Sequence, residues 1–222
     1  FNDDDSAYLS KVFASTGDRK KWTWSGWAKR STANNTTNLL FYAEPSVSAY
    51  TQIGWSGDNF QLNIAYSGTS FAYIRASAES RDVSACAHYV VVYDSANATS
   101  TDRMILYING TRVTDFAISS FPSQNALSPL NRNTTHYIGT RKNVNQYFDG
   151  SLAEVHFIDG QALAPTDFGE SDADTGVWNP IEYAGTYGTN GFHLDFSDNT
   201  STTTIGEDSS RDNHHFTSNN IR

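Results

Sequence analysis

The segment 154–159 carries the pattern in this sequence most comparable to a glycoside hydrolase site. Such hydrolases use two carboxylates that face the sugar, one as nucleophile and one as acid. In an extended strand, Glu154 shares its face with His156 and Ile158, whereas Asp159 lies on the opposite face just before a turn. The second carboxylate is therefore missing, and no Gly-x-Ser-x-Gly nucleophile motif replaces it. We predict that this chain is not an enzyme and that Glu154 makes a structural hydrogen bond or salt bridge.

Histidine and cysteine are the residue types that would indicate a transition-metal site. The six histidines are scattered, and no pair has i, i+4 spacing on a credible helix. The adjacent His214 and His215 would point opposite ways on a strand. One cysteine, Cys86, excludes a thiolate cluster and any intramolecular disulfide. The spacing therefore predicts no zinc site.

Four aromatic residues lie beside loops rich in Gly, Ser and Asn, namely Trp55, Trp178, Tyr183 and Tyr187. Aromatic faces at an exposed edge of the fold could stack on the apolar faces of sugar rings. These four are the candidate ligand-binding residues. The alternative for each is packing, since most aromatic side chains contribute to cores.

The composition limits the class of fold and of ligand. Ser, Thr, Asn and Gly make up more than a third of the 222 residues, and 14% are aromatic, which favours many short strands joined by polar loops. The net charge of −9 argues against a nucleic-acid partner. The longest apolar stretches have five residues, too few to cross a membrane as a helix.

The elements that must position these residues are predicted as regularly spaced strands. Residues 60–64 alternate, with Phe60, Leu62 and Ile64 facing inward, and Trp22 and Trp24 share one strand face. Further strands are expected at 38–43, 50–55, 71–78, 87–94, 103–108, 135–139, 146–148, 151–158 and 191–196. Asn109-Gly110 indicates a hairpin turn. Residues 116–133 are expected to form a long connection, and one helical turn is expected within 162–170. This spacing predicts an all-β antiparallel sandwich.

Several segments also resemble a known family. The chain resembles concanavalin A-like, laminin G-like jelly-roll domains, in the version found in structural proteins of tailed phages and marine viruses. The resemblance is carried by residues 22–30, 81–82, 88–94, 103–110, 147–160, 175–180 and 187–192, with 147–160 the most specific. It spans nearly the whole chain and is informative for the fold rather than for the ligand.

The resemblance implies a location, a metal and partners. The fold often holds Ca²⁺ through loop oxygens, so Asp195, Asp198, Asp208 and Asp212 are candidate ligands, against the alternative of solvated loop acids in local turns. A place on the virion surface is expected, in a tail or head fibre that contacts host-surface glycans. The alternatives are a structural capsid or tail decoration that contacts other virion subunits, and a glycoside hydrolase of the same fold. The protein is expected to be oligomeric or repeated in its assembly.

The domain organisation follows from the same features. No linker run or low-complexity block divides the chain, so we expect one domain over residues 1–222, with 191–222 supplying a terminal strand and loop. The sequence opens on Phe1 without a Met or a signal peptide. We expect a piece of a longer protein or a processed product.

Overall fold

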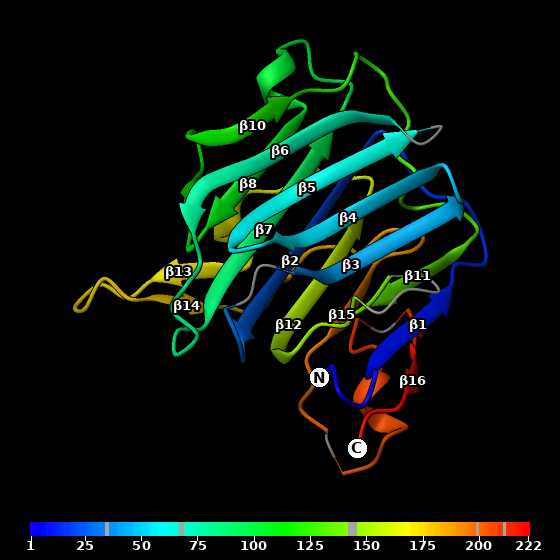
Figure 1. Cartoon of the computed structure of the whole chain (residues 1–222), viewed down its shortest axis with the longest axis vertical. Helices are drawn as coiled ribbons and strands as arrows, with labels where there is room; N and C mark the ends of the chain where they lie inside the picture. The colour runs from blue at the N-terminus through cyan, green and yellow to red at the C-terminus, as the bar shows by residue number, and fades with distance from the viewer. Residues whose placement is uncertain (34–35, 67–68, 142–145, 199, 211) are drawn as a thin grey trace.

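The computed structural model describes residues 1–33, 36–66, 69–141, 146–198, 200–210 and 212–222. Two antiparallel sheets pack face to face in it (Figure 1). The larger sheet has eight strands, in the order β10 (Phe116–Ser120), β6 (Thr69–Glu79), β5 (Asn59–Tyr66), β4 (Ala49–Ser56), β3 (Thr37–Ser46), β11 (Thr135–Ile138), β1 (Tyr8–Val12) and β16 (Thr217–Asn219). The smaller sheet has six, in the order β15 (Phe192–Leu194), β12 (Gly150–Asp159), β2 (Lys21–Arg30), β7 (Ala87–Asp94), β8 (Met104–Ile108) and β9 (Thr111–Arg112). The predicted antiparallel β-sandwich is confirmed.

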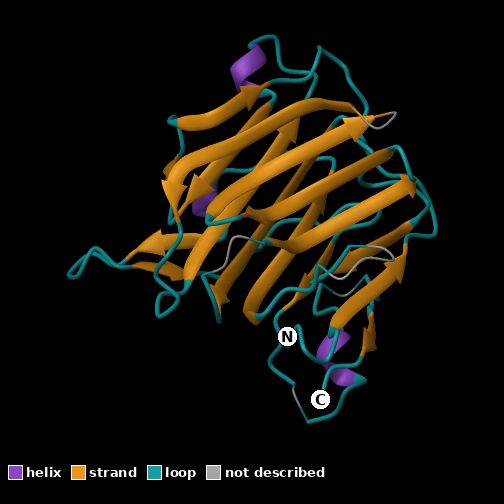
Figure 2. Cartoon of the chain, in the orientation of Figure 1, coloured by secondary structure: helices purple, strands orange, loops and turns teal. Residues whose placement is uncertain are grey.

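Helical structure is confined to single turns in the described residues (Figure 2). The 3₁₀ turn η2 (Pro165–Asp167) lies within the predicted window. Two further 3₁₀ turns, η1 (Ser100–Asp102) and η3 (Thr204–Gly206), were not predicted. No helix in the described part of the chain has the length and apolar character needed to span a membrane.

The main core lies between the two sheets. It contains Trp22 and Trp24 from β2 and Phe60, Leu62 and Ile64 from β5, all fully buried as the alternation predicts. Burying such aliphatic and aromatic side chains stabilises the fold by about 1.5–3 kcal/mol each. The alternation thus fixes which face of each strand joins the core.

The outer face of the six-stranded sheet is covered as well. Val90 and Val92 of β7 and Ile158 of β12 point away from the main core, into a second apolar cluster with Phe168, Tyr183 and Tyr187. The covering segment contains η2 and the hairpin of β13 (Gly169–Ser171) and β14 (Trp178–Pro180). Because β7 is buried on both faces, its sequence is apolar almost throughout.

Two strand predictions were wrong. Residues 116–120 form β10, inside the stretch expected to be a connection. This edge strand pairs with β6 alone, and it was missed because its five residues lie in a stretch rich in Ser, Asn and Pro, a composition that indicates a connection. Residues 146–148 form no strand, although a short strand was expected there.

The last residues of the chain join both sheets. β15 pairs with β12, and β16 pairs with β1. The N-terminal amino group of Phe1 donates to the carbonyl oxygen of Gly150, 149 positions away. β15 and β16 therefore each add an outermost strand to one of the two sheets, next to strands from much earlier in the sequence.

Candidate functional site

A cleft of about 860 Å³ lies where the covering segment passes over the edge of the six-stranded sheet. This volume falls in the usual range for small-molecule sites. One wall is the continuous segment 180–188. The opposite side is lined by Glu154, His193, Asp195, Ser209, Ser210 and Asp212. The cleft therefore combines aromatic, hydroxyl, carboxylate and imidazole groups.

Two of the predicted aromatic residues line this cleft. The rings of Tyr183 and Tyr187 meet edge to face, with centroids 5.2 Å apart. Both are about nine-tenths buried, because they also pack in the outer apolar cluster. The Tyr183 hydroxyl donates to the carbonyl oxygen of Thr186, and a Cβ at Gly185 would lie 2.2 Å from that hydroxyl oxygen. The hydrogen bond and the ring packing thus hold this wall in place, and little of either ring is exposed to a ligand.

The other two aromatic candidates are placed elsewhere. The expected surface position of Trp55 is wrong, since its ring is 1% exposed and stacks with Phe148 in the main core. Gly54 and Ser56 lie with Trp55 inside β4, the turn begins only at Gly57, and the strand directs the ring inward. Trp178 is half-buried and does not line the cleft. Its indole N–H donates to Nδ1 of His88, and its ring covers the backbone at Gly110 and Gly169.

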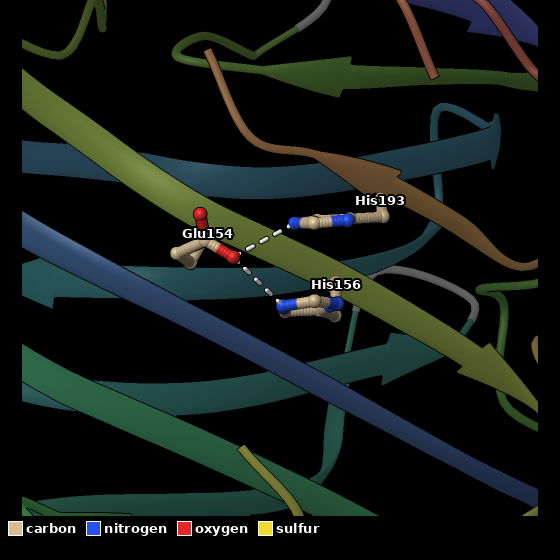
Figure 3. Close-up of side chains that lie close together, drawn as sticks. All are labelled: Glu154, His156 and His193. Atoms are coloured by element: carbon tan, nitrogen blue, oxygen red, sulfur yellow. Dashed lines mark hydrogen bonds and ion pairs between the residues drawn. The ribbon is translucent and has the colours of Figure 1, made fainter. Parts of the chain in front are cut away.

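At the floor of the cleft, a carboxylate lies beside the edges of two stacked imidazoles (Figure 3). Oε2 of Glu154 lies 2.9 Å from Nε2 of His193 and 3.6 Å from Nε2 of His156. His156 and His193 are cross-strand partners on β12 and β15, and their rings stack with centroids 4.0 Å apart. The prediction of a structural hydrogen bond at Glu154 is confirmed.

A bulge in β12 brings Glu154 to this position. The pairing of β12 with β2 shifts register between Ala153 and His156, and Glu154 has φ +48°. A left-handed backbone is uncommon for a non-glycine residue and typical of a bulge. The bulge interrupts the alternation of β12, while Glu154 lies on the same side of the strand as His156, as the sequence predicted.

The electrostatics of this cluster favour a carboxylate and a neutral inner imidazole. The ring nitrogens of His156 and His193 lower the pKa of Glu154 to about 2. Burial lowers the pKa of His156 to about 4, although Glu154 opposes this shift. Nδ1 of His156 lies 3.2 Å from the Tyr187 hydroxyl, which fixes the ring. Two imidazole nitrogens and one carboxylate oxygen thus form a donor set that could hold a metal ion.

The four aspartates predicted as Ca²⁺ ligands have separate surroundings. Asp208 is 8% exposed and accepts hydrogen bonds from the backbone N–H groups of His193, Ser210 and His214. Asp198 accepts from Thr200 in a local turn. Within the described ranges, the four do not come together as a group of three ligating side chains.

Asp195 and Asp212 both line the cleft. The Asp195 carboxylate accepts from the backbone of Ser197 and from the Ser209 hydroxyl. Burial acts to raise the pKa of Asp195, but these hydrogen bonds outweigh it and leave the pKa lowered. Asp212 is exposed at the rim.

The sequence missed the pairing of His156 with His193. These histidines lie 37 positions apart, and the i, i+4 test applies only to helices. The signal that could have found them is the strand assignment itself, because residues directly opposite on paired strands share a face. Only the register of β12 with β15 makes them neighbours.

The comparisons with known proteins concern the fold. A family model described as the concanavalin A-like lectin/glucanases superfamily, of the laminin G type, matches residues 1–167. No curated protein sequence gives a significant match. The heptameric SAP-like pentraxin of Limulus polyphemus is similar in structure, with a TM-score of 0.51, 18% identity and 71% of each chain covered.

Two other solved structures are similar at lower scores. Domains LG4-5 of the mouse laminin alpha1 chain give a TM-score of 0.49 and 11% identity, covering 80% of this chain and 42% of that chain. The CBM40 of the Ruminococcus gnavus IT-sialidase gives 0.47 and 12%, covering 72% of this chain and 95% of that one. With the sandwich described above and the family model matched over residues 1–167, this chain belongs to the concanavalin A-like lectin/glucanases superfamily.

Proposed function

We propose that this protein binds carbohydrate without cleaving it, through the cleft between segment 180–188 and the edge of β12 and β15. The observation that carries the proposal is the lining of that cleft. Tyr183 and Tyr187 offer ring edges, while Ser210, Glu182 and Asp212 offer hydroxyl and carboxylate groups. Such a combination suits a ligand with apolar ring faces and many hydroxyls, because a few placed polar groups orient it.

The state of the two inner carboxylates supports binding rather than hydrolysis. Glu154 is hydrogen-bonded to His193, and both oxygens of Asp195 accept hydrogen bonds from serine residues. A glycosidase needs one carboxyl group that is free to donate a proton and a second one aligned with it. The hydrogen bonds at Glu154 and Asp195 instead suit fixed acceptors in a binding site.

A glycan array with the purified protein tests this function, run with Ca²⁺ and again with a chelator. The rim variant Glu182→Gln/Asp212→Asn should weaken binding by about tenfold, as expected when hydrogen bonds to charged groups are lost. Asp174→Asn is the matched control, since Asp174 is exposed but lies outside the cleft. A loss of binding in the chelator that is restored by Ca²⁺ but not by Zn²⁺ would support the predicted Ca²⁺ dependence.

The other functions predict different results. A folded protein that binds no glycan would favour the structural decoration hypothesis. Release of reducing sugar from laminarin, agarose or alginate, abolished by Glu154→Gln, would favour a hydrolase. Equal binding by the rim variant and the control would place the glycan site outside the cleft.

We further propose that the protein lies on a virion surface, where repeated copies contact host glycans. This placement is supported by the sequence resemblance to viral structural proteins. A single shallow site would bind at about the millimolar level, and repetition around a fibre or capsid would raise avidity by about 10²–10⁴. Antibodies against the protein should label intact particles of the encoding virus. Absence of labelling on intact particles would refute this location.

A further inference from the structure

We propose that Glu154, His156 and His193 bind one divalent transition-metal ion, with Zn²⁺ as the fitting ion, at the floor of the cleft. Their ligating atoms all lie within 4.8 Å of one another. Zinc holds nitrogen and oxygen ligands at about 2.0–2.1 Å, which puts neighbouring ligand atoms of a tetrahedron about 3.3 Å apart. The Oε2 atom of Glu154 lies 2.9 and 3.6 Å from the two Nε2 atoms. The more exposed ring, that of His193, must rotate out of its stack on His156 so that both Nε2 lone pairs point at one ion.

The donor set selects the class of metal. Two imidazole nitrogens and one carboxylate oxygen suit Zn²⁺ and its first-row neighbours. Calcium prefers six to eight oxygen ligands and is a poor match to this set. The inference is therefore independent of the aspartates predicted to bind Ca²⁺.

The backbone brings the three side chains close together, and rotation of the His193 ring would complete the donor set. The register of β12 with β15 sets His156 directly opposite His193, and the rings are stacked with planes 12° apart (Figure 3). The bulge then turns Glu154 toward both rings, at a left-handed φ of +48°. Such a conformation costs free energy in a non-glycine residue, and bulges often re-aim a side chain next to a functional site.

A partner beyond the donors also fits metal binding. Nδ1 of His156 lies 3.2 Å from the Tyr187 hydroxyl. In the tautomer that donates from Nδ1 to this hydroxyl oxygen, Nε2 presents its lone pair toward Glu154. A ligating histidine usually uses its other ring nitrogen in such a hydrogen bond, which fixes the tautomer and the ring orientation.

The site is covered on one side and open on the other. The side chain of His156 is 2% exposed, whereas those of His193 and Glu154 are 16% and 32% exposed and line the cleft. An ion would replace the hydrogen bond between Glu154 and Nε2 of His193, with the proton moving to Nδ1 of His193 or to solvent, and would leave a coordination position on the cleft side. That position would accept water or an oxygen donor of a bound molecule.

The test uses tag-free, chelator-treated protein titrated with Zn²⁺ by calorimetry and with Co²⁺ by visible absorption. The expected result is one Zn²⁺ per chain and the absorption bands of tetrahedral Co²⁺ with nitrogen and oxygen ligands. His193→Gln and the near-isosteric Glu154→Gln should each weaken binding at least tenfold. His214→Gln removes a histidine outside the cluster and should bind as the unmodified protein does. Near-UV circular dichroism confirms that each variant is folded.

A second pair of variants separates a metal site from a hydrogen-bonded cluster that serves only stability. Tyr187→Phe removes only the hydroxyl and should weaken Zn²⁺ binding by about 10-fold to 100-fold, as is typical for an outer partner of a ligating histidine. Tyr107→Phe, on a ring packed against the same apolar cluster, should leave it unchanged. The proposal is overturned if the folded protein binds no Zn²⁺ or Co²⁺, or if His193→Gln and His214→Gln bind equally. Tyr187→Phe binding as tightly as Tyr107→Phe would also overturn it. None of these outcomes bears on the glycan array, which is read separately in chelator.

Discussion

Oδ1 of Asp159 accepts a 2.6 Å hydrogen bond from Nδ2 of Asn131, 28 positions earlier in the chain. The same carboxylate accepts from the backbone N–H groups of Asp18 and Asn190. Asp159 is 6% exposed and Asn131 is fully buried. One carboxylate at the end of β12 therefore joins three separate loops.

Asp159→Ala should destabilise the fold by about 3 kcal/mol, because it leaves several buried N–H groups without an acceptor. Urea denaturation monitored by tryptophan fluorescence measures the change. Asp174→Ala, at an exposed position of the β13–β14 hairpin, should leave the midpoint unchanged. Equal midpoints for the two variants would show that the Asp159 hydrogen bonds add nothing to stability.

Trp178→Ala should lower the free energy of unfolding by about 2 kcal/mol, through lost packing and an unpaired His88 nitrogen. Gly169→Ala should also destabilise, because its Cβ would lie 2.7 Å from the Trp178 indole. Thermal denaturation measures both changes. Glycan binding by the folded Trp178→Ala protein should persist, and its loss at unchanged stability would restore the stacking hypothesis.

Stability should depend on pH through His136, which is fully buried and stacks on Phe13. Burial lowers the pKa of His136 to about 3, against about 6.5 in an unfolded chain. As the pH falls, the His136 ring therefore takes up a proton at a higher pH in the unfolded chain than in the folded one. This contribution to stability is complete above about pH 6.5 and is lost at about 1.4 kcal/mol per pH unit as the pH falls toward 3. An NMR titration of the His136 ring should show no protonation in the folded protein down to pH 5, and a midpoint near 6.5 would contradict this.

The left-handed backbone of Glu154 at the bulge leads to a prediction about stability that does not depend on any ligand. Glu154→Gly should be more stable than Glu154→Ala by about 1 kcal/mol, since only glycine adopts the left-handed region without strain. Ser151 is a control on the same strand with an ordinary φ, and there the alanine variant should be the more stable one. Urea midpoints in the presence of a chelator measure all four. The same order at both positions would mean that Glu154 carries no backbone strain.

Local patterns in the sequence were enough to predict the sandwich. The alternation of Phe60, Leu62 and Ile64 predicted the buried face of β5. Asn109-Gly110 forms the predicted hairpin turn between β8 and β9, with φ values of +46° and +75°. The site depends on register, which no local pattern contains. Without the pairing of β12 with β15, Glu154 and His193 are unrelated residues. Strand alternation correctly placed Glu154 on the face of His156, but it did not predict the bulge that interrupts the pairing of β12 with β2 at this point.

Tyr183 and Tyr187 could be selected as loop aromatics, whereas the same rule failed for Trp55. The difference lies in the backbone. Trp55 belongs to β4, which is paired on both sides. Its ring contacts the rings of Phe60 and Tyr89 edge to face. Nearby glycines signal a turn but do not tell whether the adjacent aromatic residue precedes it within a strand.

The position of β1 between β11 and β16 has a consequence for how this chain folds. The side-chain amide of Asn219 donates a hydrogen bond to the Ser10 hydroxyl, 209 positions away. The last strand of the eight-stranded sheet can therefore pair only when nearly the whole chain is present. Closing such long loops costs entropy before any contact repays it, which makes folding slow. Until then, β1 presents an unpaired edge to other chains. Correct assembly of this β-sandwich therefore requires that β16 pairs with β1 before a strand of a neighbouring molecule does.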